Sequence, residues 1–178
     1  LVNNAGASWG SPAEDHPLEA WDKVMNLNVR GYFLLSQIIA KKSMIPRKTG
    51  RIINLASIAG LNGNPPAMQT IAYNTSKGAV INFTRALAAE WGKHHITVNA
   101  ICPGFVLTPL IEKQIEIIAK RDNIPIEQAS RRLVEEKQPS GAFSAPQDIG
   151  EMVAFLVSEN SKQVNGAAWT IDGCWTAV

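Results

Sequence analysis

The sequence has few cysteines, no long apolar run and almost no excess of charge of either sign. Its two cysteines, Cys102 and Cys174, lie far apart and outside any metal-binding spacing, which argues against a disulfide framework and a zinc site. Seventeen basic and fifteen acidic residues leave a formal charge of +2, too balanced for a surface that binds nucleic-acid phosphates. The apolar stretch at 32–35 is far shorter than the ~20 apolar residues that span a bilayer. We therefore expect a cytoplasmic protein with no metal, no nucleic-acid partner and no membrane partner.

Strand-like and helix-like segments alternate along what we interpret as one domain, residues 1–178. The chain opens as the end of a strand, and further strands are predicted at 51–55, 96–101 and 168–171. Helices are predicted at 18–44, at 71–93, in the charged segment 109–139, and after a capping box formed by Ser144 and Gln147. The charged segment is expected to lie outside the main core. This alternation is typical of an α/β fold with a doubly wound parallel sheet.

Tyr73 and Lys77 are four residues apart in a predicted helix, so their side chains share one face. A free phenol titrates near ~10, and a nearby ammonium group favours the phenolate and lowers that pKa. Tyr73 could then act as a general acid or base near neutral pH. The same spacing also occurs on ordinary exposed helices, so the pair alone does not define a site.

Two further polar residues accompany this pair. Ser57 follows the strand predicted at 51–55, at the sheet edge where open α/β sheets bind ligands, and could hydrogen-bond a substrate oxygen beside Tyr73. Asn28 lies within a predicted helix, although asparagine is a poor helix former. The simpler interpretations are a turn residue for Ser57 and a helix kink for Asn28.

Five short motifs follow one another along the chain. They are Asn3-Asn4-Ala5-Gly6, Asn28, Ser57, Tyr73 with Lys77, and Pro103-Gly104 followed by Thr108. In this order the chain resembles the classical short-chain dehydrogenases/reductases, from their fourth strand to their C-terminus. The resemblance implies a Rossmann-like fold and hydride transfer between a nicotinamide cofactor and a secondary alcohol or ketone.

The resemblance also implies a role for each motif. Tyr73 would exchange the proton, and Ser57 would polarise the substrate carbonyl. Lys77 would hold the nicotinamide ribose and lower the pKa of Tyr73, and Asn28 would anchor a water of a proton relay. The cofactor, NAD or NADP, would be bound by Asn4, Ala5, Gly6, Tyr73, Lys77, Pro103, Gly104 and Thr108.

The glycine-rich TGxxxGxG motif that binds the cofactor phosphates in this family does not occur in the sequence. We therefore expect roughly 80 residues of a complete enzyme to precede Leu1, including the residue that separates NAD from NADP. Because the family commonly pairs its long helices between subunits, a homotetramer is expected. The tryptophans are expected to pack internally or at subunit contacts: Trp9, Trp91, Trp169 and Trp175.

The substrate side of the resemblance is divided. Residues 101–110 and 166–169 resemble D-3-hydroxybutyrate dehydrogenases, and Gln114 falls on their lid glutamine, which binds the substrate carboxylate. The substrate would then contact Ser57, Tyr73 and Gln114, under a lid predicted at 109–140. At the other positions that hold the carboxylate in those enzymes, this chain has uncharged residues: Ser8, Ala59 and Thr70. Residues 62–66 are interpreted as an insertion that borders the substrate.

Three functions therefore remain open. The first is an NAD(P)-dependent oxidoreductase acting on a small secondary alcohol or ketone, with 3-hydroxybutyrate and acetoacetate as one candidate pair. The second is a 3-oxoacyl or sugar-alcohol reductase. The third is a catalytically silent chain that only assembles through its two long helices.

Overall fold

The computed structural model describes residues 1–66, 68–135 and 137–178. Within these residues, parallel strands form one sheet in the order β1-β2-β3-β4. Their bounds are β1 Val2–Asn3, β2 Gly50–Leu55, β3 Ile96–Pro103 and β4 Ala168–Ile171. The predicted strands and the α/β fold class are confirmed, with β3 two residues longer than expected.

The helices also follow the predicted order. They are α1 Leu18–Met25, α2 Gly31–Ile39, α3 Ile45–Arg47, α4 Ile71–Trp91, α5 Pro109–Asp122, α6 Ile126–Glu135 and α7 Pro146–Val157. The first three form one continuous helical segment, because the wider π turns η1 (Asn26–Arg30) and η2 (Ala40–Met44) join them. No helix among the described residues is long and apolar enough to cross a membrane.

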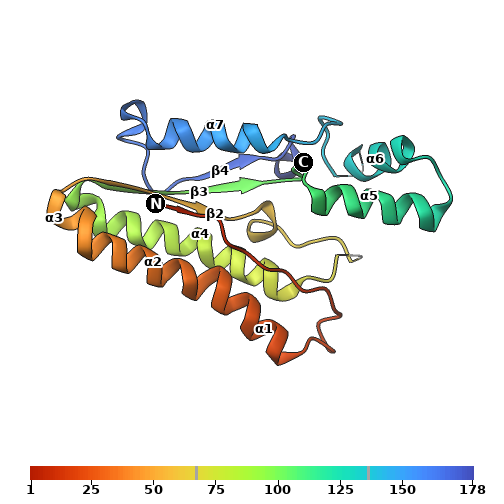
Figure 1. The fold of residues 1–178 in the computed structure, drawn as a ribbon, viewed down its shortest axis with the longest axis horizontal. Coiled ribbons are helices and arrows are strands. Elements are labelled where there is room, and N and C mark those ends of the chain that lie inside the picture. The colour runs from red at the N-terminus through yellow and green to blue at the C-terminus, as the bar shows by residue number, and fades with distance from the viewer. Residues whose placement is uncertain (67, 136) are drawn as a thin grey trace.

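Helices cover both faces of the sheet (Figure 1). On one face, Ile52 and Val98 pack with Leu87 of α4. On the other face, Ile53 and Ile101 pack with Leu156 of α7. Alternate residues of a strand point to opposite faces, so the apolar runs in β2 and β3 supply both cores. The carboxyl ends of the strands are thereby fixed between two helical layers.

The segment from α5 to α6 lies beyond the carboxyl end of β3 (Figure 1). The expectation that it lies outside the main core is met only in part, because its apolar stripe forms a cluster of its own. Ile115 and Leu133 are buried in that cluster together with Phe105. The segment is therefore anchored to the sheet through the residue that follows β3.

The capping box predicted from Ser144 and Gln147 is wrong by one residue. Ala145 precedes the first turn of α7, and its backbone N–H donates to the Asp148 carboxylate at 2.6 Å. Pro146 occupies the first helical position, where the missing N–H costs nothing, and this fixes the start of the helix.

Candidate active site

The predicted site residues gather at the carboxyl edge of the sheet. Asn4, Ala5 and Gly6 follow β1 and are exposed, while Pro103 ends β3. Ser57 follows β2, begins the short 3₁₀ helix η3 (Ile58–Gly60), and is 8% exposed. Its hydroxyl accepts the N–H of Ala59 at 3.1 Å and therefore caps η3. The same bond fixes the position of the Ser57 side chain in the site.

Glycine is required where η3 meets α4. A Cβ atom on Gly60 would overlap the backbone of Lys77 and lie 2.6 Å from the nitrogen of Gly78. Neither obstacle is a flexible side-chain end, so a larger residue would push η3 away from the helix. The close approach keeps Ser57 beside the first turns of α4, which carry Tyr73 and Lys77.

Asn28 lies in the π turn η1 and is fully buried. Its Oδ1 accepts the N–H of Ala7 at 2.8 Å, and its Nδ2 donates to the Ala7 carbonyl and to Ser76 Oγ, both at 2.9 Å. The side chain therefore ties the segment after β1 to α4. The wide turn explains how an asparagine is tolerated inside a helix, because π turns loosen the regular hydrogen-bond pattern.

Lys77 is buried beneath the site, with 5% of its surface exposed. Its Nζ donates a 2.6 Å hydrogen bond to the Leu55 carbonyl, which also accepts the Tyr32 hydroxyl at 3.2 Å. Loss of solvent disfavours the ammonium form and lowers the pKa of Lys77 to about 8. This lysine still carries its proton at neutral pH.

In this structure the pKa of Tyr73 lies above its ordinary value, and Lys77 is not among the groups that shift it. Desolvation by burial raises the pKa of Tyr73, and its hydrogen bond with Ser57 opposes that rise only in part. The Lys77 ammonium lies over the face of the tyrosine ring, 5.5 Å from its centroid, and its short hydrogen bond goes to Leu55.

Two cavities meet at Ser57 and Tyr73. One, of about 230 Å³, is lined by Pro103 and Thr108 as well as by these two residues. The other, of about 300 Å³, extends toward α5 and is lined by Gln114. Gly104 borders both, so the site has two compartments with the serine and the tyrosine at their junction.

The larger cavity is lined by the residues that correspond to the carboxylate-binding positions of D-3-hydroxybutyrate dehydrogenases. Ser8, Ala59 and Thr70 line it together with Gln114. No lysine or arginine lines it within residues 1–66, 68–135 and 137–178. The segment predicted as an insertion contributes Asn64, whose Nδ2 donates to Thr70 Oγ1 at 2.9 Å and to Asn74 Oδ1 at 3.0 Å. This side of the cavity is therefore polar, neutral and internally bonded.

Two residues of the site were missed from the sequence. Trp175, expected to pack internally or at a subunit contact, lines the larger cavity and lies 5.1 Å from Phe105 between ring centroids. Gln138 is fully buried; its Oε1 accepts the Phe105 N–H at 2.6 Å and its Nε2 donates to the Ala142 carbonyl at 2.6 Å. A glutamine in a charged stretch gives no sign of such burial, so only the fold reveals it.

Among the described residues, no group of three or more histidine, cysteine or acidic side chains could hold a metal ion.

Comparison with known proteins agrees with this arrangement. A family model described as enoyl-(acyl carrier protein) reductase matches residues 1–176. D-beta-hydroxybutyrate dehydrogenase of Cupriavidus necator is 45% identical over 99% of this chain, which covers 67% of that protein. 2-(S)-hydroxypropyl-CoM dehydrogenase 3 of Xanthobacter autotrophicus is 42% identical over the whole chain, which covers 66% of that protein.

Solved structures show the same fold. A variant of actinorhodin polyketide ketoreductase with NADPH has a TM-score of 0.88 and 34% identity, covering 100% of this chain and 67% of its own. 4-Hydroxyisoleucine dehydrogenase complexed with NADH has a TM-score of 0.81 and 31% identity, covering 100% of this chain and 69% of its own. The chain belongs to the short-chain dehydrogenase/reductase family of NAD(P)-dependent oxidoreductases, and it spans about two thirds of the length of these relatives.

Proposed function

We propose that the complete protein interconverts a small neutral secondary alcohol and its ketone with NAD or NADP. The observation that carries this proposal is the position of Ser57 and Tyr73 at the junction of two cavities. One compartment suits the nicotinamide and the other the substrate. Relatives with NADH and with NADPH support the cofactor class without choosing between the two.

The residues of the smaller compartment fit a nicotinamide. A Cβ atom on Gly6 would lie 3.7 Å from Asn28 Oδ1 and 3.9 Å from Lys77 Nζ, so the segment after β1 passes directly beside the lysine. Asn4, Ala5, Pro103, Gly104 and Thr108 would hold the cofactor in this compartment. When bound, the cofactor supplies or accepts the hydride.

The chain itself supplies orientation and a proton. The Ser57 hydroxyl would donate a hydrogen bond to the substrate oxygen, and Tyr73 would give or take the proton at that same oxygen. Because burial raises the pKa of Tyr73, the phenol is protonated at neutral pH and suited to donation in the reductive direction. Lys77 would hold the cofactor ribose, and Asn28 would carry a relay water next to Ala7.

The neutral lining favours a neutral substrate. A carboxylate that enters the larger cavity loses solvent, and an unpaired buried charge is costly. Gln114 offers an amide and no charge, and a hydrogen bond to a charged group contributes only about 1.5–3 kcal/mol. The second candidate is 3-hydroxybutyrate, which is favoured by the 45% identical relative and by the position of Gln114. Leu110, Ile111 and Gln114 all line this cavity, which supports a lid function for 109–140.

Steady-state kinetics of the full-length enzyme with two matched substrates would test the proposal. D-3-Hydroxybutyrate and its amide differ only in the terminal group, which is a charged carboxylate in one and a neutral amide of similar size in the other. We expect kcat/KM to be at least ~tenfold higher for the amide, because it avoids the uncompensated desolvation. A preference for the carboxylate would identify the 3-hydroxybutyrate function, and no turnover of either substrate or of other secondary alcohols would favour the silent chain.

We also propose that the protein works in the cytoplasm as a homotetramer. Its cysteines Cys102 and Cys174 are unpaired, which suits a reducing compartment. Apolar side chains on the segment from α1 to α2 support assembly, because Leu18, Phe33 and Leu35 are 79%, 44% and 50% exposed. Light scattering of the full-length protein should give the mass of an oligomer, and a monomer at working concentration would contradict the assembly.

A further inference from the structure

A second polar cavity lies at the opposite edge of the sheet from the active site. It has a volume of about 350 Å³ and lies at the amino ends of β2 and β3. Its lining includes Thr49, Arg51, His95, Thr97, Glu159 and Lys162. None of these residues belongs to the site proposed for catalysis.

The floor of this cavity is built by the sheet itself. Arg51 and Thr97 are register partners on β2 and β3, so their side chains leave the sheet on the same face. Apolar residues on that face are covered by α7, which ends at Val157. The stretch that follows α7 contributes Glu159 and Lys162 to the cavity wall above the arginine and the threonine.

Both floor residues have a buried donor without a partner. Thr97 is 5% exposed, and its Oγ1 makes no hydrogen bond. The side chain of Arg51 is 16% exposed; it donates from one terminal nitrogen to the Gly50 carbonyl, but its buried Nε–H has no acceptor. A buried donor left without an acceptor is destabilising, and an arginine Nε can only donate. Both donors lie in the floor beneath the cavity, shielded from solvent, and a side-chain rotation would bring them to an acceptor in the cavity.

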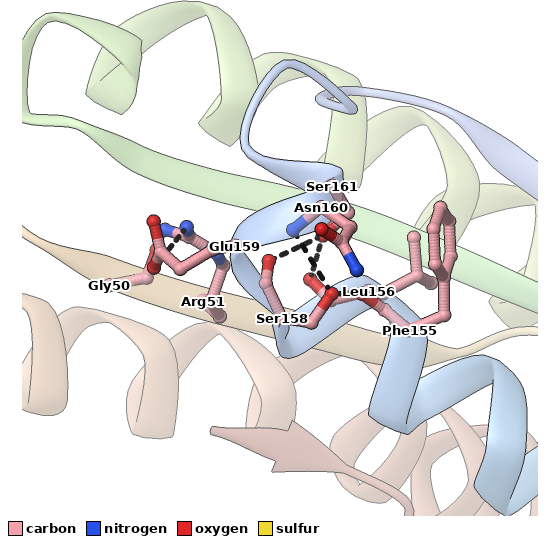
Figure 2. Close-up of polar contacts among 8 residues, drawn as sticks. All are labelled: Gly50, Arg51, Phe155, Leu156, Ser158, Glu159, Asn160 and Ser161. Carbon is pink, nitrogen blue, oxygen red and sulfur yellow. Dashed lines mark hydrogen bonds and ion pairs between the residues drawn. The ribbon is translucent and has the colours of Figure 1, made fainter.

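The acid next to Arg51 does not supply an acceptor for these donors. Glu159 Oε1 is 3.5 Å from a terminal nitrogen of Arg51, and the glutamate side chain is 90% exposed (Figure 2). An ion pair at that distance and exposure is weak. Lys162 also lies on the cavity wall, so an anion that entered would meet the positive charges of Arg51 and Lys162 against the one negative charge of Glu159.

The nearby end of α7 does not cancel this attraction. The last carbonyls of a helix carry partial negative charge, which would repel an anion. Here Ser158 Oγ donates to the Phe155 carbonyl at 2.8 Å, and Ser161 Oγ donates to the Leu156 carbonyl at 2.9 Å (Figure 2). These hydroxyl groups satisfy two of the last carbonyls of α7.

We propose that this cavity binds a phosphate group, either free phosphate or the phosphate of a small phosphorylated compound. The Arg51 and Thr97 side chains would rotate so that Nε and Oγ1 donate to its oxygens, with Lys162 at the rim. The proposal does not depend on the catalytic assignment, because the two sites lie at opposite ends of the parallel strands.

Thermal unfolding of the full-length protein against inorganic phosphate and, separately, glycerol 3-phosphate would test it, with chloride at matched ionic strength as the reference. We expect a saturable rise in melting temperature, because a ligand that binds only the folded state stabilises it. Binding of both ligands, or of only one, supports a phosphate site and identifies its source. No rise with either ligand would overturn the proposal and leave water as the occupant.

Variants separate this cavity from any other phosphate site, including that of the cofactor. Arg51→Gln and Thr97→Val should weaken binding, the former by at least ~tenfold, while the exposed control Arg131→Gln should leave it unchanged. Glu159→Gln should strengthen binding about twofold to fivefold, because it removes the competing carboxylate. If Arg51→Gln does not fold, the stronger binding expected of Glu159→Gln still tests the proposal. Equal binding by wild type, Arg51→Gln and Glu159→Gln would overturn the proposal.

Discussion

Replacement of Lys77 by methionine is expected to stabilise the folded protein at neutral pH while it removes activity. The lysine is 5% exposed, so no solvent screens its charge, and its pKa falls from the ordinary 10.5 to about 8. That difference corresponds to about 3 kcal/mol of destabilisation of the charged form in the native state. Methionine has a similar length and no charge. It loses the bond to the Leu55 carbonyl, and a bond from a charged donor contributes about 1.5–3 kcal/mol, so the net gain expected near pH 7 is at most about 1.5 kcal/mol.

The pH dependence distinguishes this cause from a simple packing effect. Below pH 8 the native and unfolded states both carry the Lys77 proton, and the folded protein bears the whole cost of the buried charge. Between pH 8 and 10.5 the native state has lost the proton while the unfolded chain still binds it, so the stability of the wild type rises with pH. The stability of Lys77→Met relative to wild type should therefore fall by about 2 kcal/mol between pH 6.5 and 9.5.

Urea unfolding of the full-length protein, followed by tryptophan fluorescence at both pH values and at one protein concentration, would measure this difference. Lys120→Met, at an exposed position of α5, is the matched control and should show little change between the two pH values. If Lys77→Met is less stable than wild type at pH 6.5, or if its advantage is the same at both pH values, the charge of Lys77 is not buried as described.

Three further changes test the site itself. Tyr73→Phe removes the proton donor, so turnover should fall by ~10² or more while dinucleotide binding, measured by fluorescence titration, stays nearly unchanged. Thr70→Lys places a cation in the larger cavity and should raise kcat/KM for D-3-hydroxybutyrate relative to its amide by at least ~tenfold in the same assay. Gly104→Ala would overlap Gln138 Oε1 and should cost about 2 kcal/mol in urea unfolding, whereas Gly63→Ala, with no atom within 4 Å, should cost much less.

The sequence predicts the order of elements well because each strand and helix has its own apolar period. The strand at 168–171 and the helix that begins near Ile71 are found where the pattern places them. The motifs are also found together, since parallel strands bring their carboxyl ends to one edge. What the sequence does not predict is how each group is solvated. The rise in the pKa of Tyr73 depends on burial, which cannot be derived from a spacing of four residues.

Long-range contacts account for the other differences. Gln138 is separated from Phe105 by 33 residues, and the bond between them fixes the backbone after β3 against the segment that follows α6. Trp175 reaches the larger cavity because a turn after β4 returns it to Phe105, where Asp172 accepts the N–H of Thr176 at 2.9 Å. Local propensity carries no information about contacts between residues so far apart in the sequence. The contacts of Gln138 and Trp175 with Phe105 are therefore known only from the fold.

The same turns of α4 serve both the fold and the proposed chemistry. Tyr73, Ser76 and Lys77 are spaced three and four residues apart and therefore share one helix face. Ser76 accepts the amide of Asn28, which in turn holds the segment after β1, and Lys77 holds the last carbonyl of β2. A shift of α4 would consequently move the ends of both strands together with the tyrosine. The buried polar bonds thus keep the two compartments in register, and this explains why a lysine whose burial costs stability is retained in the interior of the protein.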